Sequence, residues 1–244
     1  MQTFLHDLKY ALRMLKKNPA FTTVAILTLA VGIGANSAIF SVVNSVLLRP
    51  LPYRQPGQLV RVYSEFPTMQ LTKFWLSPPE LLDIQHEAKS WEAIGGWAPG
   101  GQNVGTESEP LRVTSAAITR SMIDVLGVQP ERGRNFTEEE DRNGGPQVAI
   151  ISHGLWQKGF GGTNDIIGKQ IQVDAKTTTI VGVMPANFAF PPGSNEQVEL
   201  LVPFQFDPAN PGERGSHFLS VIGRLKPGVT IEQAQSEMTS LMAG

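Results

Sequence analysis

The chain contains no cysteine among its 244 residues. This absence excludes disulfide bonds, thiol nucleophiles and cysteine-ligated zinc. Charge is also missing from one long stretch, because no Asp, Glu, Lys or Arg occurs between Lys17 and Arg49. No second stretch of the sequence is both uncharged and apolar over a comparable length. The sequence therefore offers one segment that can cross a lipid bilayer.

The uncharged run, residues 18–48, predicts a transmembrane helix. It is rich in Val, Ile, Leu and Phe, and it exceeds the roughly 20 apolar residues of helix that cross a bilayer core. A helix also satisfies its own backbone hydrogen bonds in lipid. The alternative is a signal peptide cleaved near Ala35-Asn36-Ser37, where small residues fit a cleavage site. Apolar sequence continues past that site from Ala38 to Leu48, which favours retention, and N-terminal sequencing would decide.

Basic residues ahead of the run indicate its orientation. The first 17 residues hold four Lys or Arg and one Asp, and basic flanks stay on the cytoplasmic side of a membrane. We therefore expect a cytoplasmic N-terminus, with residues 50–244 on the periplasmic side of a bacterial inner membrane. Residues 1–17 form either an amphipathic helix on the inner membrane surface or an unstructured lead-in. Apolar residues at helical spacing favour the helix; they are Phe4, Leu8, Leu12 and Leu15.

Small residues recur every four positions along the predicted membrane helix. Residues four apart share a helix face, and small side chains let a neighbouring helix approach closely in lipid. Such residues are also common in membrane helices generally, so the pattern has a plainer explanation beside this one. The predicted helix-packing face comprises Ala30, Gly34, Ala38, Ser41 and Ser45.

The charge balance after the lead-in is mildly acidic. The whole chain has 20 basic and 22 acidic residues, and 16 and 21 remain once residues 1–17 are set aside. This balance argues against a nucleic-acid partner. About 195 residues follow the membrane run, enough for one large or two small domains.

The sequence after Arg49 alternates between strand and helix patterns, which predicts an α+β fold. Two capping boxes mark helix starts, Ser77 with Glu80 and Thr230 with Gln233. The last helix should bury Ile231, Ala234, Met238 and Leu241. Predicted strands cover 59–66, 111–118, 147–151, 169–174, 177–183, 198–202 and 217–225. Predicted helices begin at 78, 121, 138 and 231, with the first broken by the glycine-rich stretch 95–105 and the second closed by Gly127.

The matching strand–helix units near the two ends of this part predict a division into two. We expect residues 57–126 and 215–244 to form one subdomain, and residues 127–214 to be an inserted second one.

No arrangement of residues typical of an enzyme is visible. The acidic run 138–141 is explained as a solvated helix start facing the helix dipole. Gly161-Gly162 and Gly168-Lys169 lack the spacing of a phosphate-binding loop, and Gly-x-Ser-x-Gly is absent. We therefore predict no catalytic, cofactor-binding or metal-binding residue and no enzymatic activity. Residues weighed as ligands or groove-lining groups, and judged structural, are His6, His86, His153, His217, Trp75, Trp91, Trp97 and Trp156.

Several short motifs together resemble a known family. The sequence is similar to MacB/FtsX-type ABC transporter permeases, and most similar to the duplicated orphan permeases abundant in acidobacteria. The resemblance extends over nearly the whole chain. The motifs are residues 32–44, 47–53, 125–130, 133–136, 148–156, 167–169, 181–185 and 225–230.

The resemblance implies a first membrane helix followed by a MacB-like periplasmic core domain, 50–244, with a porter-like part and an inserted sabre-like part. It implies work with an ABC ATPase subunit or domain, whose ATP hydrolysis moves the periplasmic domain for export or efflux. Further partners that it implies are a periplasmic adaptor protein and a second copy in a homodimer. Family members continue into three more membrane helices, so we expect this chain to be an N-terminal fragment.

Two other functions stay open at this point. One is a membrane-anchored periplasmic binding or adaptor module without transport activity, which makes similar demands on the sequence. The other is a membrane-tethered enzyme, which would need a cluster of titratable residues that the sequence does not display. Co-purification of an ATPase would favour the permease, and turnover lost on changing one His or Glu would favour the enzyme.

Overall fold

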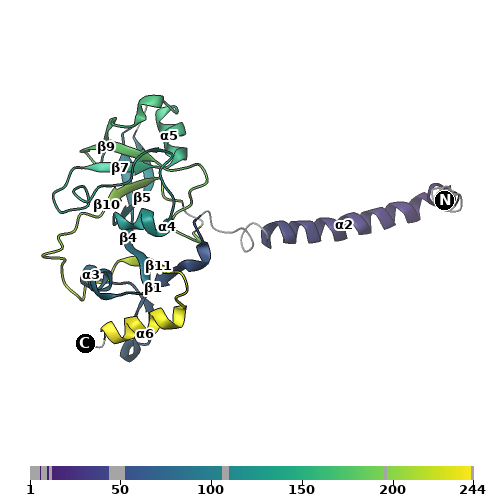
Figure 1. Cartoon of the computed structure of the whole chain (residues 1–244). Coiled ribbons are helices and arrows are strands. Elements are labelled where there is room, and N and C mark those ends of the chain that lie inside the picture. The colour runs from purple at the N-terminus through teal and green to yellow at the C-terminus, as the bar shows by residue number, and fades with distance from the viewer. Residues whose placement is uncertain are drawn as a thin grey trace. The chain divides into compact units, whose positions relative to one another are not determined.

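The computed structural model describes residues 6, 10, 13–43, 53–105, 110–194 and 197–242. The chain divides into two compact units, residues 1–50 and 51–244, and each is treated by itself below. Figure 1 shows the helix of the first unit and the sheet of the second.

The first unit contains helix α2, Pro19–Val43. Pro19 stands at its first position, where the missing N–H costs nothing. Thr22, Thr23 and Thr28 turn their hydroxyls back to carbonyls four residues earlier, so these polar groups are satisfied within the helix. Residues 13–17 are helical as well. Phe4, Leu8 and Leu12 of the predicted amphipathic helix, and residues 44–48 of the predicted span, lie outside the described residues.

The second unit is built on a mixed sheet, nine-stranded within the described residues, in the order β1-β11-β4-β5-β10-β7-β9-β6, with β8 pairing with β4 and β9. Strands β10 and β5 run parallel, as do β7 and β9. Together with the helices this confirms the predicted α+β class. The strands are β1 (Leu59–Val62), β4 (Trp91–Val104), β5 (Leu111–Ile118), β6 (Arg132–Gly133), β7 (Val148–Ile151), β8 (Gln170–Val173), β9 (Lys176–Val183), β10 (Leu200–Pro203) and β11 (Ser220–Leu225). A separate hairpin pairs β2 (Ser64–Phe66) with β3 (Leu71–Phe74).

Helices cover both faces of this sheet. The α-helices are α3 (Pro78–Glu87), α4 (Ser121–Leu126), α5 (His153–Phe160) and α6 (Ile231–Met242). Short 3₁₀ turns are η2 (Pro56–Gln58), η3 (Pro67–Met69) and η4 (Asn164–Ile166). Both predicted capping boxes are present, since Ser77 N–H donates to Glu80 at 2.7 Å and Thr230 N–H donates to Gln233 at 2.9 Å.

The core consists of three clusters, and the period-two alternation of the strands separates them. In β7, Ile150 faces the cluster around α4 while Ala149 and Ile151 face the cluster around α5. In β11, Ile222 packs with α4, whereas Val221 packs with α3 and α6. Figure 1 shows α3 and α6 near β1 and β11, and α5 near β7 and β9. Alternating side chains thus bury both faces of one sheet.

The glycine-rich stretch does not break a helix, contrary to the sequence prediction. Helix α3 ends at Glu87, and residues 91–104 form one long strand, β4. A Cβ on Gly95 would lie 3.0 Å from Met122 Cα of α4, and a Cβ on Gly96 would lie 2.7 Å from Leu81 Cδ2 of α3. The glycines are therefore explained by close packing of a helix on each face of β4.

Three further predictions need correction. Residues 59–66 form two strands in different sheets, because the chain leaves the large sheet after Val62. Residues 138–141 form a turn rather than a helix, although Glu140 N–H donates to Thr137 Oγ1 as a capping box would. The stripe of α6 is only partly buried, with Ala234 buried but Ile231 54% exposed.

Candidate functional site

Helix α2 is the described helix that is long and apolar enough to cross a membrane. The span Pro19–Ser41 has a mean hydropathy of 1.8, and none of it is buried inside the protein. A helix exposed and apolar on all sides needs an apolar surrounding, and a bilayer supplies one. Length and composition alone carry this assignment, and they agree with the predicted transmembrane segment.

The predicted helix-packing face lies on this exposed helix. Ala30, Gly34, Ala38 and Ser41 are all exposed, and no other part of the protein lies within 4 Å of the position that a Cβ on Gly34 would take. Ser45 lies outside the described residues. The packing of other helices against this face stays a prediction.

The histidines do not form a metal site in the described part of the chain, where no group of three or more His, Asp or Glu side chains converges. His6 and His86 are exposed. His153 pairs with Glu131, with 2.6 Å between Nδ1 and Oε1. His217 Nε2 lies 3.3 Å from Glu80 Oε2, and its ring contacts Phe66 and Phe74. Both pairs join separate segments of the chain.

The tryptophans lie in separate parts of the sheet domain, and Trp91 also lines a surface pocket with residues of β1 and α6. Trp91, Trp97 and Trp156 are buried in the three core clusters. Trp75 is 52% exposed and lies against Phe74. The four rings therefore do not line a common cavity.

The acidic run is only half solvated, which corrects the sequence interpretation. Glu140 is buried and accepts two hydrogen bonds from Arg134, at 2.7 and 2.8 Å. These bonds lower the pKa of Glu140, chiefly through the Arg134 guanidinium. Asp141 accepts from the backbone N–H groups of Arg120 and Phe204. Burial nevertheless raises the pKa of Asp141. Both carboxylates fix loops in place.

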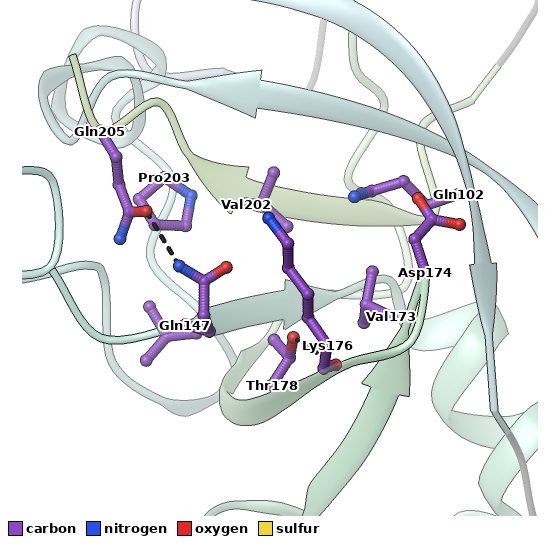
Figure 2. Close-up of a pocket in the computed structure, with 10 residues that line it drawn as sticks. Gln102, Gln147, Val173, Asp174, Lys176, Thr178, Val202, Pro203 and Gln205 are labelled. Carbon is purple, nitrogen blue, oxygen red and sulfur yellow. Dashed lines mark hydrogen bonds between the residues drawn. The ribbon is translucent and has the colours of Figure 1, made fainter. Parts of the chain in front are cut away.

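A polar cavity of about 140 Å³ opens where β7 and β10 separate (Figure 2). The two strands pair at Leu200 with Ile151 and at Leu201 with Ile150, and the ladder then ends. The Lys176 side chain reaches across the cavity toward Val202 in Figure 2. The cavity is lined by Gln102, Gln147, Val148, Val173, Asp174, Lys176, Thr178, Val202, Pro203 and Gln205.

Most polar groups around this cavity are already paired with the protein. Gln147 donates to Gln205, which donates to two backbone carbonyls. Asp174 accepts from the backbone and side chain of Asn103. Gln102 Oε1 is buried and lacks a hydrogen bond within the described residues. An ordered water could donate to this amide oxygen.

One buried charge was missed by the sequence analysis. Arg224 of β11 is fully buried. Its guanidinium donates to Val125 O at 2.9 Å, Leu126 O at 3.3 Å and Gln55 O at 3.3 Å. Carbonyls at the C-terminal end of a helix lack hydrogen-bond donors within the helix. Arg224 supplies the donors for the last two carbonyls of α4, those of Val125 and Leu126. The only signal in the sequence is a charged residue inside the apolar run Val221–Leu225.

Comparisons with known proteins bear on the whole chain. A family model described as the MacB-like periplasmic core domain matches residues 22–241, which include most of α2. The periplasmic region of MacB from Actinobacillus actinomycetemcomitans is 16% identical over 75% of this chain and 81% of that chain, with a TM-score of 0.55. The extracellular domain of the noncanonic ABC-type transporter YknZ from Gram-positive bacteria is 18% identical over 75% and 90%, with a TM-score of 0.54. No curated protein sequence matches the chain.

Proposed function

The chain belongs to the family of MacB-like periplasmic core domains of ABC-transporter-type permeases, and from this premise we propose that it is the anchor and periplasmic core of a permease that a partner ATPase drives. The observation that carries the proposal is the family match across both α2 and the sheet domain. The family supplies a permease component rather than a classical enzyme.

The proposed orientation places the N-terminus in the cytoplasm and residues 50–244 in the periplasm. The four basic residues of the lead-in support it through the positive-inside rule. In this arrangement ATP is hydrolysed by a separate subunit or domain on the cytoplasmic side, and movement of the membrane helices displaces the periplasmic domain for export or efflux. The small-residue face of Ala30, Gly34, Ala38, Ser41 and Ser45 would receive neighbouring membrane helices.

The proposed division of the domain has support in the sheet. Strands β1, β11, β4 and β5 come from the porter-like part, 57–126 and 215–244, and they are consecutive in the sheet. Strands β10, β7, β9 and β6 come from the insert, 127–214, and they are the next four strands along the sheet after β5. The two groups meet mainly at the parallel pair of β5 and β10. A periplasmic adaptor protein and a second copy of the chain remain proposed partners of these parts.

Co-purification tests the proposal. The native protein, tagged at the end of the chain and extracted in mild detergent, should retain an ABC ATPase, and its ATP hydrolysis should change when the permease is present. A Gly34→Leu variant should retain less ATPase, because the larger side chain separates the packed membrane helices. Val24→Leu is the control on the same helix. Capture of periplasmic proteins without any ATPase would contradict the proposal and favour a binding or adaptor module.

A further inference from the structure

The first described residues after the membrane helix are fixed tightly to the sheet domain. Residues 53–58 form what we name the attachment segment, which ends in the 3₁₀ turn η2 and leads directly into β1. Tyr53 is buried in the central core cluster, 6% exposed, and its hydroxyl donates to Ala189 O. Arg54 pairs with Glu92 at the start of β4. Tyr53 thus joins the segment to the loop after β9, and Arg54 joins it to β4.

The buried Arg224 side chain also contacts the attachment segment. Leu59, the residue after the attachment segment, lies opposite Arg224 in the β1–β11 ladder. From there the guanidinium reaches Gln55 O as well as Val125 O and Leu126 O. Arg54 provides a nearby positive charge and Glu92 a nearby negative one. A fully buried arginine loses its hydration, so its five N–H donors must be satisfied by protein groups.

The end of α4 is shaped to accept this arrangement. Gly127 closes α4 with φ +66°, and a Cβ there would lie 2.7 Å from Arg54 Cβ and 3.5 Å from Arg224 Nη2. Gln55 itself adopts a left-handed conformation with φ +43°. A non-glycine residue keeps such a conformation only when its surroundings impose it. The hydrogen bond from Arg224 to Gln55 O is one such constraint.

We propose that Arg224 and Tyr53 clamp the attachment segment onto the sheet, so that a displacement of the membrane helix is passed to both parts of the domain. This inference rests on the proposed function. Tyr53 reaches Ala189 in the insert, while Arg224 and Glu92 belong to the porter-like part. The segment is therefore bonded to both parts of the domain. Arg224 and Tyr53 act as positioning residues.

A plain structural role is the competing explanation, and the two differ in how far the effect of a substitution spreads. If Arg224 only stabilises the fold, its loss should weaken the whole sheet evenly. If it clamps the segment, its loss should release residues 53–62 first, because segments open locally when their own contacts are removed. Amide hydrogen exchange on the full chain in nanodiscs separates these outcomes.

In that experiment Arg224→Met and Tyr53→Phe are compared with the native chain. We expect Arg224→Met to accelerate exchange in peptides covering residues 53–62 roughly tenfold more than in peptides of β7 and β9, which corresponds to about 1.4 kcal/mol of additional local opening. The general loss of stability accelerates β7 and β9 as well, but by the smaller factor. Arg142→Met is the control, since Arg142 forms only an exposed pair with Glu138. If Arg224→Met does not fold, Tyr53→Phe, which removes one hydroxyl, still gives the answer. Equal exchange in residues 53–62 would overturn the clamp.

A second measurement separates failure of the clamp from failure of the proposed function. Because the chain has no cysteine, spin labels can be placed at Gly154→Cys and Gly215→Cys, where a Cβ meets open space or only an ordinary contact. In membranes containing the partner ATPase, ATP should change the distance between the labels, and Tyr53→Phe or Arg224→Met should reduce that change at least by half. No ATP response in the native chain would contradict the proposed function. An equal response in native chain and variants would overturn the clamp alone.

Discussion

At the scale of single residues, two buried charges stabilise the sheet domain in different ways. Arg224 satisfies three backbone carbonyls from two segments. Glu140 instead forms a two-point pair with Arg134, whose own side chain is half exposed. Removing a buried polar group leaves its partners without a hydrogen bond, and this loss costs more than the bond itself contributes. Both residues therefore allow sharp tests of stability.

Replacing Arg224 with Met should destabilise the domain strongly. Each buried carbonyl left without a donor costs about 1–3 kcal/mol. Two of the three bonds, to Val125 O and Leu126 O, are buried, so we expect a loss of roughly 2–6 kcal/mol in the free energy of unfolding. Urea unfolding followed by the fluorescence of the buried tryptophans measures it. Arg142→Met should change the free energy by at most about 0.5 kcal/mol, because an exposed pair contributes little. A loss as small as that of the control would show that the three bonds are not formed.

Glu140→Gln should remove a pH-dependent part of the stability. The pKa of Glu140 is lowered below its ordinary value of 4.5 in the folded state, chiefly by Arg134. A carboxyl with a lowered pKa contributes its full stability above the ordinary value and loses it as the pH falls through the folded-state value. Native protein should therefore be more stable than the variant at pH 7, and the difference should shrink below about pH 4.5. Urea midpoints at pH 7, 5, 4 and 3 test this; a constant difference would contradict it.

Neither charge could have been located from the sequence. Arg224 occupies a strand whose neighbours are apolar, and only the packing of β11 beside α4 places carbonyls around it. For Glu140 the sequence predicted a solvated helix start, whereas the structure has a turn in which Glu140 accepts from Thr137 N–H and donates its own N–H to Thr137 Oγ1. The direction of its side chain could not be predicted, because its partner Arg134 follows strand β6 and no local pattern links the two residues. The sequence shows which residues are charged, but the partners of Arg224 and Glu140 are set by tertiary contacts.

At the scale of elements, local signals predicted best where they were strongest. Residues 121–126 are helical and end at Gly127, as the sequence indicated. The hairpin of β8 and β9 turns at Asp174 and Ala175, both with positive φ. The long strand β4 was missed because glycine has low strand propensity, and its glycines are required by helices packed on both faces. In β4, the packing of helices on both faces outweighed the low strand propensity of glycine.

Gly223→Ala tests this close packing. A Cβ at Gly223 would lie 2.3 Å from Trp91 Cε3, so the indole must move and the core must adjust. We expect a loss of about 1–3 kcal/mol, the usual cost of overpacking. Gly57→Ala is the matched control, since no atom lies within 4 Å of its added Cβ. Thermal unfolding of both variants should lower the midpoint for Gly223→Ala only; equal midpoints would mean that Trp91 has room to move.

Val31→Arg tests helix α2. Val31 is 71% exposed near the middle of the span, and a charge at the centre of a membrane helix costs about 2.5–3.5 kcal/mol on insertion scales. The share of protein in the membrane fraction should fall. Val31→Leu should leave it unchanged. If Val31→Arg fractionates as the native protein does, α2 does not span the bilayer.

At the scale of the whole molecule, the family assignment covers both α2 and the sheet domain. The sequence motifs predicted the family and the α+β class, and the family match confirms the first. The strand order could not be predicted, because β10 enters between β5 and β7 from a segment far along the chain. Such non-local pairing depends on the packing of complete layers rather than on any local pattern.

The central claim is that α2 crosses the membrane and leaves the sheet domain outside the cytoplasm. Because the native chain has no cysteine, a single Met14→Cys or Gly144→Cys variant can be labelled in intact spheroplasts with a membrane-impermeant maleimide. The account predicts labelling of Gly144→Cys without lysis and of Met14→Cys only after lysis. Labelling of Gly144→Cys only after lysis would contradict it.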